Sequence, residues 1–247
     1  MADLVLRGRI MPASNATFLA ELDGVEVVYK PVAGERPLWD FPDGTLADRE
    51  VASYLVAEAT GWDLVPRTWL GDGPHGPGML QEWQEVDPDD DAVTLVPAGR
   101  VPTGWLSVFD GYDDRDREVT LVHEDSAPLR RLAVVDVLLN NADRKGGHVL
   151  AMPDGRRLGV DHGVTLHHER KLRTVLWGWA GEPLTVEEVE VVDHVRAAVR
   201  GGLGERLEQH LTDLELTALE RRCERLLAIG RLPQPGRGWP AIPWPPF

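Results

Sequence analysis

Two runs of β-type residues flank the dipeptide Asp23-Gly24, and this pattern constrains the fold of the first part of the chain most strongly. The runs occupy residues 16–22 and 25–31. A two-residue hairpin turn requires positive φ at both of its positions. Asp-Gly is typical of such turns, because both residues can adopt positive φ. Residues whose numbers sum to 47 then face each other, so Thr17 is expected opposite Lys30. The chain is therefore predicted to begin with an antiparallel sheet that carries Lys30.

A helix is expected after this hairpin, over residues 45–61. Thr45 or Asp48 can cap its start, apolar residues recur at helical spacing, and Gly61 ends the run.

Strands are expected next, at residues 62–70 and 78–83, with a turn-rich stretch between them. The acidic stretch 85–91 is interpreted as a solvated linker. A second helix is predicted over residues 126–141, with Ser at its cap and Pro in its first turn.

A second hairpin is predicted from residues 146–152 and 157–163. If Asp154-Gly155 is a two-residue turn, paired numbers sum to 309 and His148 faces Asp161. Directly opposed residues have Cβ atoms about 5 Å apart, so the two side chains are expected to meet.

The rest of the chain is predicted to be mainly helical, over residues 184–203 and 205–232, with an extended Pro/Trp-rich tail at 238–247. A β-rich first part and a helix-rich second part indicate an α+β protein with two lobes. We expect the lobes to span residues 1–85 and 86–247.

Composition narrows the classes of partner. The formal net charge is −15, from 41 acidic and 26 basic residues, so most of the surface is expected to repel nucleic acid and anionic membranes. Cys223 is the single cysteine and cannot form an internal disulfide. The chain shows no apolar run of signal-peptide or membrane-spanning length, so a cytoplasmic location without stable membrane association is expected.

Lys30 and its neighbours form the first candidate site. Opposite Thr17, its ammonium is expected near the loop 12–15, whose backbone N–H groups can bind phosphate. Glu50 on the following helix can pair with this lysine. The residues alone leave open a solvated lysine and an exposed helical glutamate.

Asp143 and Asp161 form the second candidate site. Asp143 lies just past a helix end, where a carboxylate can reach a substrate hydroxyl or merely cap a turn. Asp161 precedes His162-Gly163, an order similar to the metal-binding Asp-Phe-Gly of kinases. His148 is a candidate metal ligand, a hydrogen-bond partner of Asp161, or simply a strand residue; its imidazole suits transition metals better than magnesium.

Two nearby clusters are less informative. His167-His168 is not read as a zinc site, because adjacent histidines are expected to point apart and no Cys pair completes four ligands. The basic residues Arg170, Lys171 and Arg173 are interpreted as a solvated loop or as a site for a phosphorylated acceptor.

These segments together resemble the phosphatidylinositol 3-/4-kinase-like proteins, most closely the type II phosphatidylinositol 4-kinases and small actinobacterial relatives of unknown substrate. The resemblance covers residues 13–68 and 132–163. It implies a protein-kinase-like fold with a β-rich N-lobe and a mainly helical C-lobe. The motifs that carry it are VVYKPVAGERPLWD, REVASYLVAEATGWDLVPRT, NNADRKGGHVL and VDHG.

The resemblance implies roles for individual residues. Lys30 would contact ATP phosphates with Glu50 as its partner, Asp143 would be the catalytic aspartate, and Asp161 would bind Mg²⁺ or Mn²⁺. His148 stands where the family has an asparagine as second metal ligand, which puts metal identity and catalysis in question. Further candidate nucleotide contacts are Ser14, Asn15 and Thr17 near the phosphates and Gln81, Glu82 and Trp83 at the adenine hinge.

Three functions are compatible with this pattern. The first is an ATP-dependent kinase acting on a hydroxyl of an unknown protein or small molecule. The second is a nucleotide-binding pseudokinase, suggested by His148 and by the absence of a glycine-rich loop. The third is transfer of AMP on the same fold.

Overall fold

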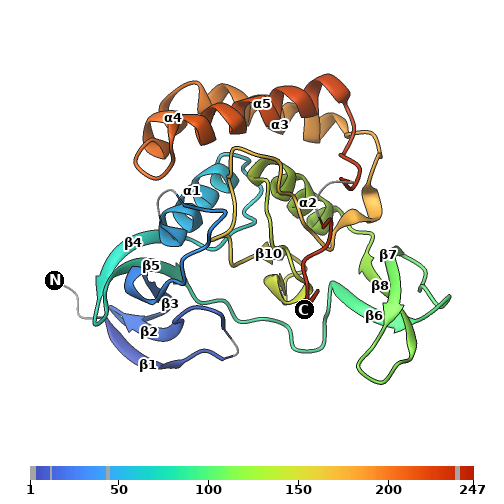
Figure 1. Cartoon of the computed structure of the whole chain (residues 1–247), viewed down its shortest axis with the longest axis horizontal. Coiled ribbons are helices and arrows are strands. Elements are labelled where there is room, and N and C mark those ends of the chain that lie inside the picture. The colour runs from blue at the N-terminus through green and yellow to red at the C-terminus, as the bar shows by residue number, and fades with distance from the viewer. Residues whose placement is uncertain (1–3, 12, 43–44, 237–239) are drawn as a thin grey trace.

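An antiparallel five-stranded sheet forms the first part of the protein, whose computed structural model describes residues 4–11, 13–42, 45–236 and 240–247. The strand order is β1-β2-β3-β5-β4 (Figure 1). The strands are β1 (Val5–Arg9), β2 (Phe18–Leu22), β3 (Val25–Pro31), β4 (Thr68–Gly73) and β5 (Gly76–Glu82).

The register of the first hairpin is confirmed. The pairs run from Phe18 opposite Tyr29 to Leu22 opposite Val25, so paired numbers sum to 47. Both turn residues have positive φ, 51° at Asp23 and 82° at Gly24, as a hairpin turn of this length requires.

The predicted strand at 62–70 is wrong in its first half, because β4 begins only at Thr68. Asp63 has a φ of 51°, and Pro66 lacks the N–H that a strand ladder needs. The segment is apolar because Leu64 and Val65 are buried in the core as irregular chain. β5 lies close to its expected place.

Helix α1 (Leu46–Glu58) begins as predicted, with the Thr45 hydroxyl accepting from the Asp48 N–H. Glu35, in the loop after the short 3-10 turn η1 (Val32–Gly34), adds a second cap: its carboxylate accepts from two backbone N–H groups at the helix start, each at 2.9 Å. A carboxylate there also suits the helix dipole. This contact ties the loop after β3 to α1.

A second sheet of three strands follows the acidic stretch, in the order β6-β8-β7 (Figure 1). Its strands are β6 (Val93–Pro97), β7 (Trp105–Tyr112) and β8 (Glu118–Glu124). These strands are absent from the elements predicted above and fall in the part expected to be mainly helical. Alternating apolar residues on either side of the turn-forming 113–117 segment are the signal that predicts them.

Helix α2 (Ala127–Leu139) is confirmed, with Ser126 as its cap and Asn140 at its end in the left-handed region with φ 52°. Most of α2 is buried on all sides, so it forms the centre of the core. Its carboxyl end leads directly into the segment that holds Asp143.

The second hairpin has a different register from the one expected. In β9 (Val149–Ala151) and β10 (Arg157–Gly159), Leu150 pairs with Leu158, so numbers sum to 308 rather than 309. The loop has three residues rather than two, with Gly155 at φ 84° and a 3.0 Å bond from Met152 N to Arg156 O. A three-residue loop shifts the pairing by one position.

Three helices form a layer over α1 and α2 (Figure 1). They are α3 (Val186–Val199), α4 (Gly202–Leu207) and α5 (Asp213–Ile229), preceded by the short turn η3 (Trp177–Trp179). The helical prediction for 205–232 is interrupted before Thr212, which starts α5 with a capping box.

This layer holds α1 through polar contacts. Arg49 of α1 pairs with Glu215 of α5, both buried, and His210 lies 2.9 Å from Asp48.

Among the helices of the described residues, none combines the length and the apolar character that crossing a membrane requires.

His123 of β8 generates a prediction about stability. It is fully buried: Nδ1 donates to the Glu124 carbonyl at 2.8 Å, and Nε2 accepts the Gly178 N–H at 3.0 Å. Burial lowers the pKa of His123, so the folded protein keeps it neutral. Below about pH 6.5 His123 is protonated in the unfolded chain but stays neutral in the folded protein. The unfolding free energy therefore falls as pH falls.

We therefore expect the unfolding free energy of the wild type to drop between about pH 6.5 and pH 5. The slope should be shallower in His123→Gln, by up to about 1.4 kcal/mol per pH unit. Urea unfolding at a series of pH values measures it, with the exposed His168→Gln as control. Equal slopes in all three proteins would contradict the prediction.

Candidate active site

Lys30 of β3 lies between two carboxylates. Its Nζ is 2.7 Å from Glu50 Oε1 of α1 and 2.7 Å from Asp161 Oδ1 after β10. Glu50 is buried, whereas the Asp161 side chain is 49% exposed. The structure thus brings together three predicted residues that are far apart in the sequence.

The electrostatics of this triad favour the charged forms of Lys30 and Asp161. Burial opposes the charge on Lys30, but Asp161 and Glu50 outweigh it and raise the pKa of the ammonium. Lys30 holds the pKa of Asp161 well below its usual range. Burial raises the pKa of Glu50, and Lys30 opposes that effect.

Glu50 also positions the Asp161-His162-Gly163 segment. Its second oxygen accepts the His162 backbone N–H at 2.8 Å. Asp161 itself has a φ of 59°, in the left-handed region. Strained backbone of this kind persists where surrounding contacts enforce it, and it is common at functional sites.

A buried ion pair supports the segment between α2 and the second hairpin. Arg144, in the loop after α2, and Asp136, within α2, are both inaccessible to solvent. All five guanidinium N–H groups of Arg144 donate hydrogen bonds. Asp136 accepts two of them, the carbonyls of His148 and Val160 accept one each at 2.9 Å, and His162 Nε2 accepts the fifth.

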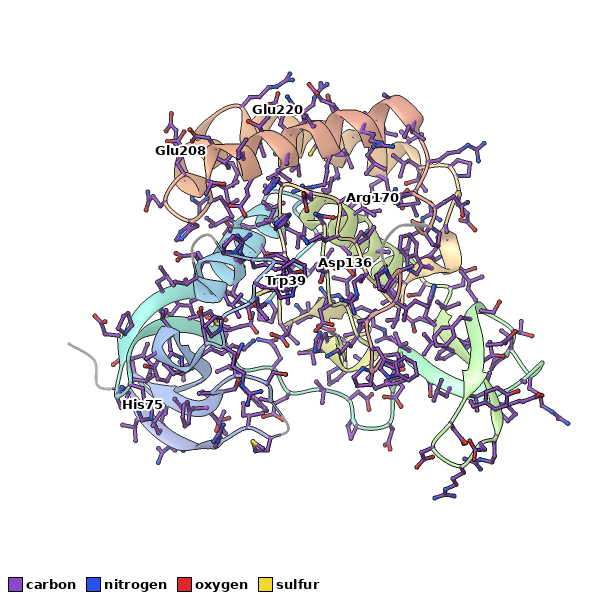
Figure 2. The ribbon with its side chains drawn as sticks, in the orientation of Figure 1. Trp39, His75, Asp136, Arg170, Glu208 and Glu220 are labelled. Carbon is purple, nitrogen blue, oxygen red and sulfur yellow. The ribbon has the colours of Figure 1, made fainter. Side chains whose placement is uncertain are left out.

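Gly159 and Asp136 both contribute to the packing around the Arg144 guanidinium. A Cβ on Gly159 would lie 2.8 Å from the guanidinium, so β10 approaches closely only because that residue is glycine. Asp136 lies on α2 near the middle of the molecule (Figure 2) and is fully buried. Arg144 and Asp136 were not predicted as site residues, although a single aspartate within an apolar helix is a signal of a buried polar role.

Asp143 lies at the start of this loop. Its backbone N–H donates to Asn141 Oδ1 at 2.9 Å, and its carboxylate is 3.2 Å from Lys145 Nζ. The side chain is 28% exposed, so it is accessible while its backbone is fixed. Lys145 is a third residue that was not predicted for this site.

His148 faces Asp161 even though the predicted register was wrong. Its Nε2 lies 3.3 Å from Asp161 Oδ2, and its Nδ1 lies 3.0 Å from the Asp143 carbonyl. A carbonyl only accepts, so we assign the proton to Nδ1. Burial lowers the pKa of His148, which favours the neutral ring. The lone pair of His148 Nε2 and the Oδ2 oxygen of Asp161 are then directed at the same position.

The predicted phosphate loop lies against the loop after β3. Pro12 lies outside the described residues. Asn15 Oδ1 accepts the Arg36 N–H at 3.0 Å, and the Thr17 hydroxyl donates to the Asn15 carbonyl at 3.3 Å. Thr17 is buried and Ser14 is exposed. Their contact with nucleotide stays a prediction.

The hydrogen-bond donors of the expected adenine hinge are already paired within the protein. Gln81 is buried and its amide donates to Thr68. The N–H of Glu82 donates to Arg67 O and that of Trp83 to Glu26 O, each at 3.0 Å. If adenine is bound here, the N–H donor has to come from a residue after Trp83.

The other two clusters differ from expectation in detail. His167 and His168 stack at 4.3 Å rather than pointing apart, and no group of three potential metal ligands occurs in the described part of the chain. Lys171 is buried and lies 3.4 Å from Asp40, while Arg170 donates to Gln234 O. The basic residues are therefore not one solvated patch.

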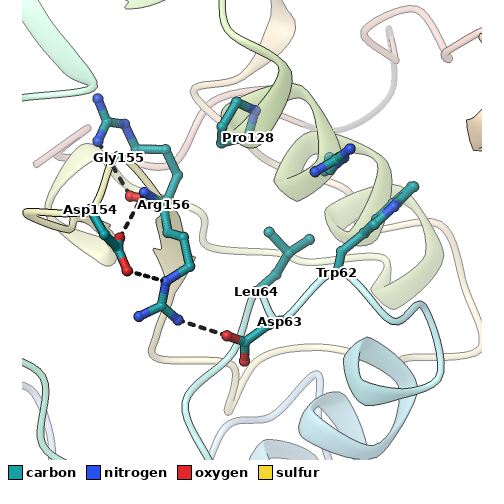
Figure 3. A pocket seen from close by; sticks show the side chains of 9 residues that line it. Trp62, Asp63, Leu64, Pro128, Asp154, Gly155 and Arg156 are labelled. Carbon is teal, nitrogen blue, oxygen red and sulfur yellow. Dashed lines mark hydrogen bonds and ion pairs between the residues drawn. The ribbon is translucent and has the colours of Figure 1, made fainter.

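A cavity of about 190 Å³ lies elsewhere, at the turn end of the β9–β10 hairpin (Figure 3). His148 and Asp161 lie at the opposite, open end. Arginines line the cavity, but Arg156 pairs with Asp63 and Asp154, and Arg157 pairs with Glu124. The cavity is not an unpaired anion site.

The Arg144 contacts predict a specific loss of stability. Arg144→Lys keeps the charge but cannot make the two-pronged contact with Asp136 and the bonds to both carbonyls. We expect the unfolding free energy to fall by about 3 kcal/mol or more, as when a buried pair is disrupted. The exposed Arg225→Lys serves as control, and urea unfolding measures both. A change below about 0.5 kcal/mol in Arg144→Lys would refute the supporting role.

Comparison with known proteins identifies both fold and family. No family model matches the chain. A solved structure of CtkA, a proinflammatory kinase of Helicobacter pylori, superimposes with a TM-score of 0.51 over 93% of this chain and 95% of that chain. The two sequences are 10% identical, so the likeness concerns the fold, which is the α+β, two-lobed, kinase-like fold.

A relative in Mycobacterium tuberculosis, Protein Rv2133c, is 51% identical over 258 residues. The match covers 99% of this chain and 92% of the relative. The chain belongs to the same family as Protein Rv2133c.

Proposed function

We propose that this protein is an ATP-dependent phosphotransferase, related to the phosphatidylinositol 3-/4-kinases, that phosphorylates a hydroxyl of a protein or small molecule with Mg²⁺ or Mn²⁺. The observation that carries the proposal is the Lys30 ammonium held at 2.7 Å from both Glu50 and Asp161. Phosphoryl transfer depends on cations beside the phosphates and on carboxylates that hold metal. A kinase-like fold supports this assignment.

Lys30 is the phosphate-binding group in this proposal. Glu50 holds the ammonium from the buried side, leaving Asp161 on the more exposed side. When a nucleotide binds, its phosphate oxygens can take the place of Asp161 beside Lys30, because both are anionic acceptors. Asp161 is then released to bind metal.

The residues at the metal position fit a divalent cation. Asp161 Oδ2 and His148 Nε2 are 3.3 Å apart, and the bond from Nδ1 to the Asp143 carbonyl leaves Nε2 with a lone pair. Two acceptors facing one point are compatible with a cation between them. The bound ion would neutralise charge that develops on the transferred phosphoryl group.

Asp143 orients the acceptor. Its backbone is fixed by Asn141, and its exposed carboxylate can accept the proton of a substrate hydroxyl. Lys145, 3.2 Å away, pairs with the carboxylate and holds it in place. The substrate class is left as a hydroxyl compound, because a fold does not specify the acceptor.

Asp143→Ala provides the first test. We expect metal-dependent ATP turnover to fall by about two to four orders of magnitude, the usual contribution of a positioned base, while ATP still binds. Turnover is followed with label on the α- or γ-phosphate, and binding by thermal shift. The exposed Asp114→Ala is a matched control.

The outcomes separate the alternatives. Binding without turnover by wild type, under any acceptor or metal, would favour the pseudokinase. Transfer of the α-label would favour AMP transfer. Either result would overturn the kinase assignment.

His148→Asn tests the metal ligand. Imidazole nitrogen suits transition metals better than magnesium, whereas an amide oxygen suits magnesium. We expect the variant to gain Mg²⁺ affinity relative to Mn²⁺, by about tenfold. Isothermal titration with each metal and a non-hydrolysable ATP analogue measures the ratio, with His168→Asn as control. An unchanged ratio would remove His148 from the metal site.

A further inference from the structure

The tail segment (residues 240–247) returns to the proposed active site. In Figure 1 its end lies beside β10, far from α5, which precedes it in the chain. It contacts two segments that also bond to each other: Arg144 N donates to Arg173 O, and Val175 N donates to Arg144 O. The tail therefore spans the Asp143 loop and the 173–177 segment.

The first part of the tail is firmly anchored. The Ala241 carbonyl accepts from Thr174 N at 3.1 Å and from Trp177 Nε1 at 2.8 Å. Ile242 packs against the main core, and Pro243 is buried. These contacts fix the direction in which the following residues run.

The last part of the tail contacts the 3-10 turn η2 (Gly146–His148). Pro246 O accepts the Gly146 N–H at 2.8 Å, a group that the turn itself leaves unpaired at its start. The Phe247 ring packs on Gly146 so closely that a Cβ there would lie 2.5 Å from a ring carbon. The tail thus braces η2 from outside.

η2 carries the groups whose positions matter in the proposed reaction. Lys145 is its N-cap and contacts Asp143, while His148 is its last residue and faces Asp161. In the described part of the chain, the hydrogen bonds of the tail go to Gly146, Thr174 and Trp177 and not to Asp143 or Asp161. The tail supports the site without covering these carboxylates.

We propose that Pro246 and Phe247 are positioning residues that hold η2, and through it Lys145 and His148, in the geometry needed for metal binding and catalysis. This inference rests on the proposed function for its effect on turnover. Its effect on η2 and on metal affinity is independent of any reaction. A misplacement of about 1 Å is enough to lower a rate by about a hundredfold.

Phe247→Ala is the primary variant, and Trp244→Ala, at a side chain 75% exposed, is its matched control. In Phe247→Ala we expect Mn²⁺ affinity to fall about tenfold, as for other residues that orient a ligand. Hydrogen exchange at the Gly146 amide should accelerate. The kcat should fall while the KM for ATP stays within about twofold, since Lys30 and Glu50 are untouched. Trp244→Ala should change none of these.

A rescue experiment tests the contact itself. Gly146→Ala should impair Mn²⁺ binding, because its Cβ meets the Phe247 ring, and the double variant Gly146→Ala/Phe247→Ala should bind Mn²⁺ better than Gly146→Ala alone. A merely destabilising substitution would not be rescued by a second one.

The results are read separately from the proposed function. If wild type binds Mn²⁺ but never turns over ATP, the kinase assignment fails while exchange, affinity and rescue still decide the role of the tail. If wild type does not bind Mn²⁺, exchange at Gly146 decides. Unchanged exchange and affinity in Phe247→Ala, absence of rescue, or increased turnover in Phe247→Ala would each overturn the proposal.

Discussion

The buried guanidinium of Arg144 joins the Asp143 loop, the second hairpin and the segment after Asp161. It neutralises Asp136 of the central helix and donates to the carbonyls of His148 and Val160 and to the ring of His162. A charge in this position is tolerated only because every N–H has an acceptor. One side chain thereby fixes the Asp143 loop, the second hairpin and the segment after Asp161 relative to the core.

The part of the site around Lys30 depends on α1 in a comparable way. Glu50 reaches Lys30 from α1, and the neighbouring Arg49 pairs with Glu215 of α5 in the buried layer above. The position of Lys30 is therefore coupled to the C-terminal helices through α1.

Asp161 takes part in both halves of the site. Its left-handed backbone directs one carboxylate oxygen to Lys30 and the other to His148. Lys30 keeps the pKa of this carboxyl low, which favours its ionised form. In the proposed function this carboxylate would bind the cation once phosphate takes its place beside the lysine. The strained backbone of Asp161 persists because the buried contacts around it enforce that conformation.

The sequence by itself determined the α+β class, the first hairpin register, and the helices α1 and α2 with their caps, because turn chemistry and helical periodicity are local signals. Motif resemblance also selected Lys30, Glu50, Asp143, His148 and Asp161. The second sheet was missed, although alternating apolar residues on either side of the 113–117 turn carry a local signal for it.

Tertiary structure decided the rest. The second hairpin shows why: a three-residue loop shifted its register, and His148 still met Asp161 because the φ of Asp161 and the bond from His148 to the Asp143 carbonyl aimed the side chains. The Arg144–Asp136 pair depends on burial within the core. The tail contact depends on close approach between Gly146 and Pro246, about 100 residues apart, which no local pattern encodes.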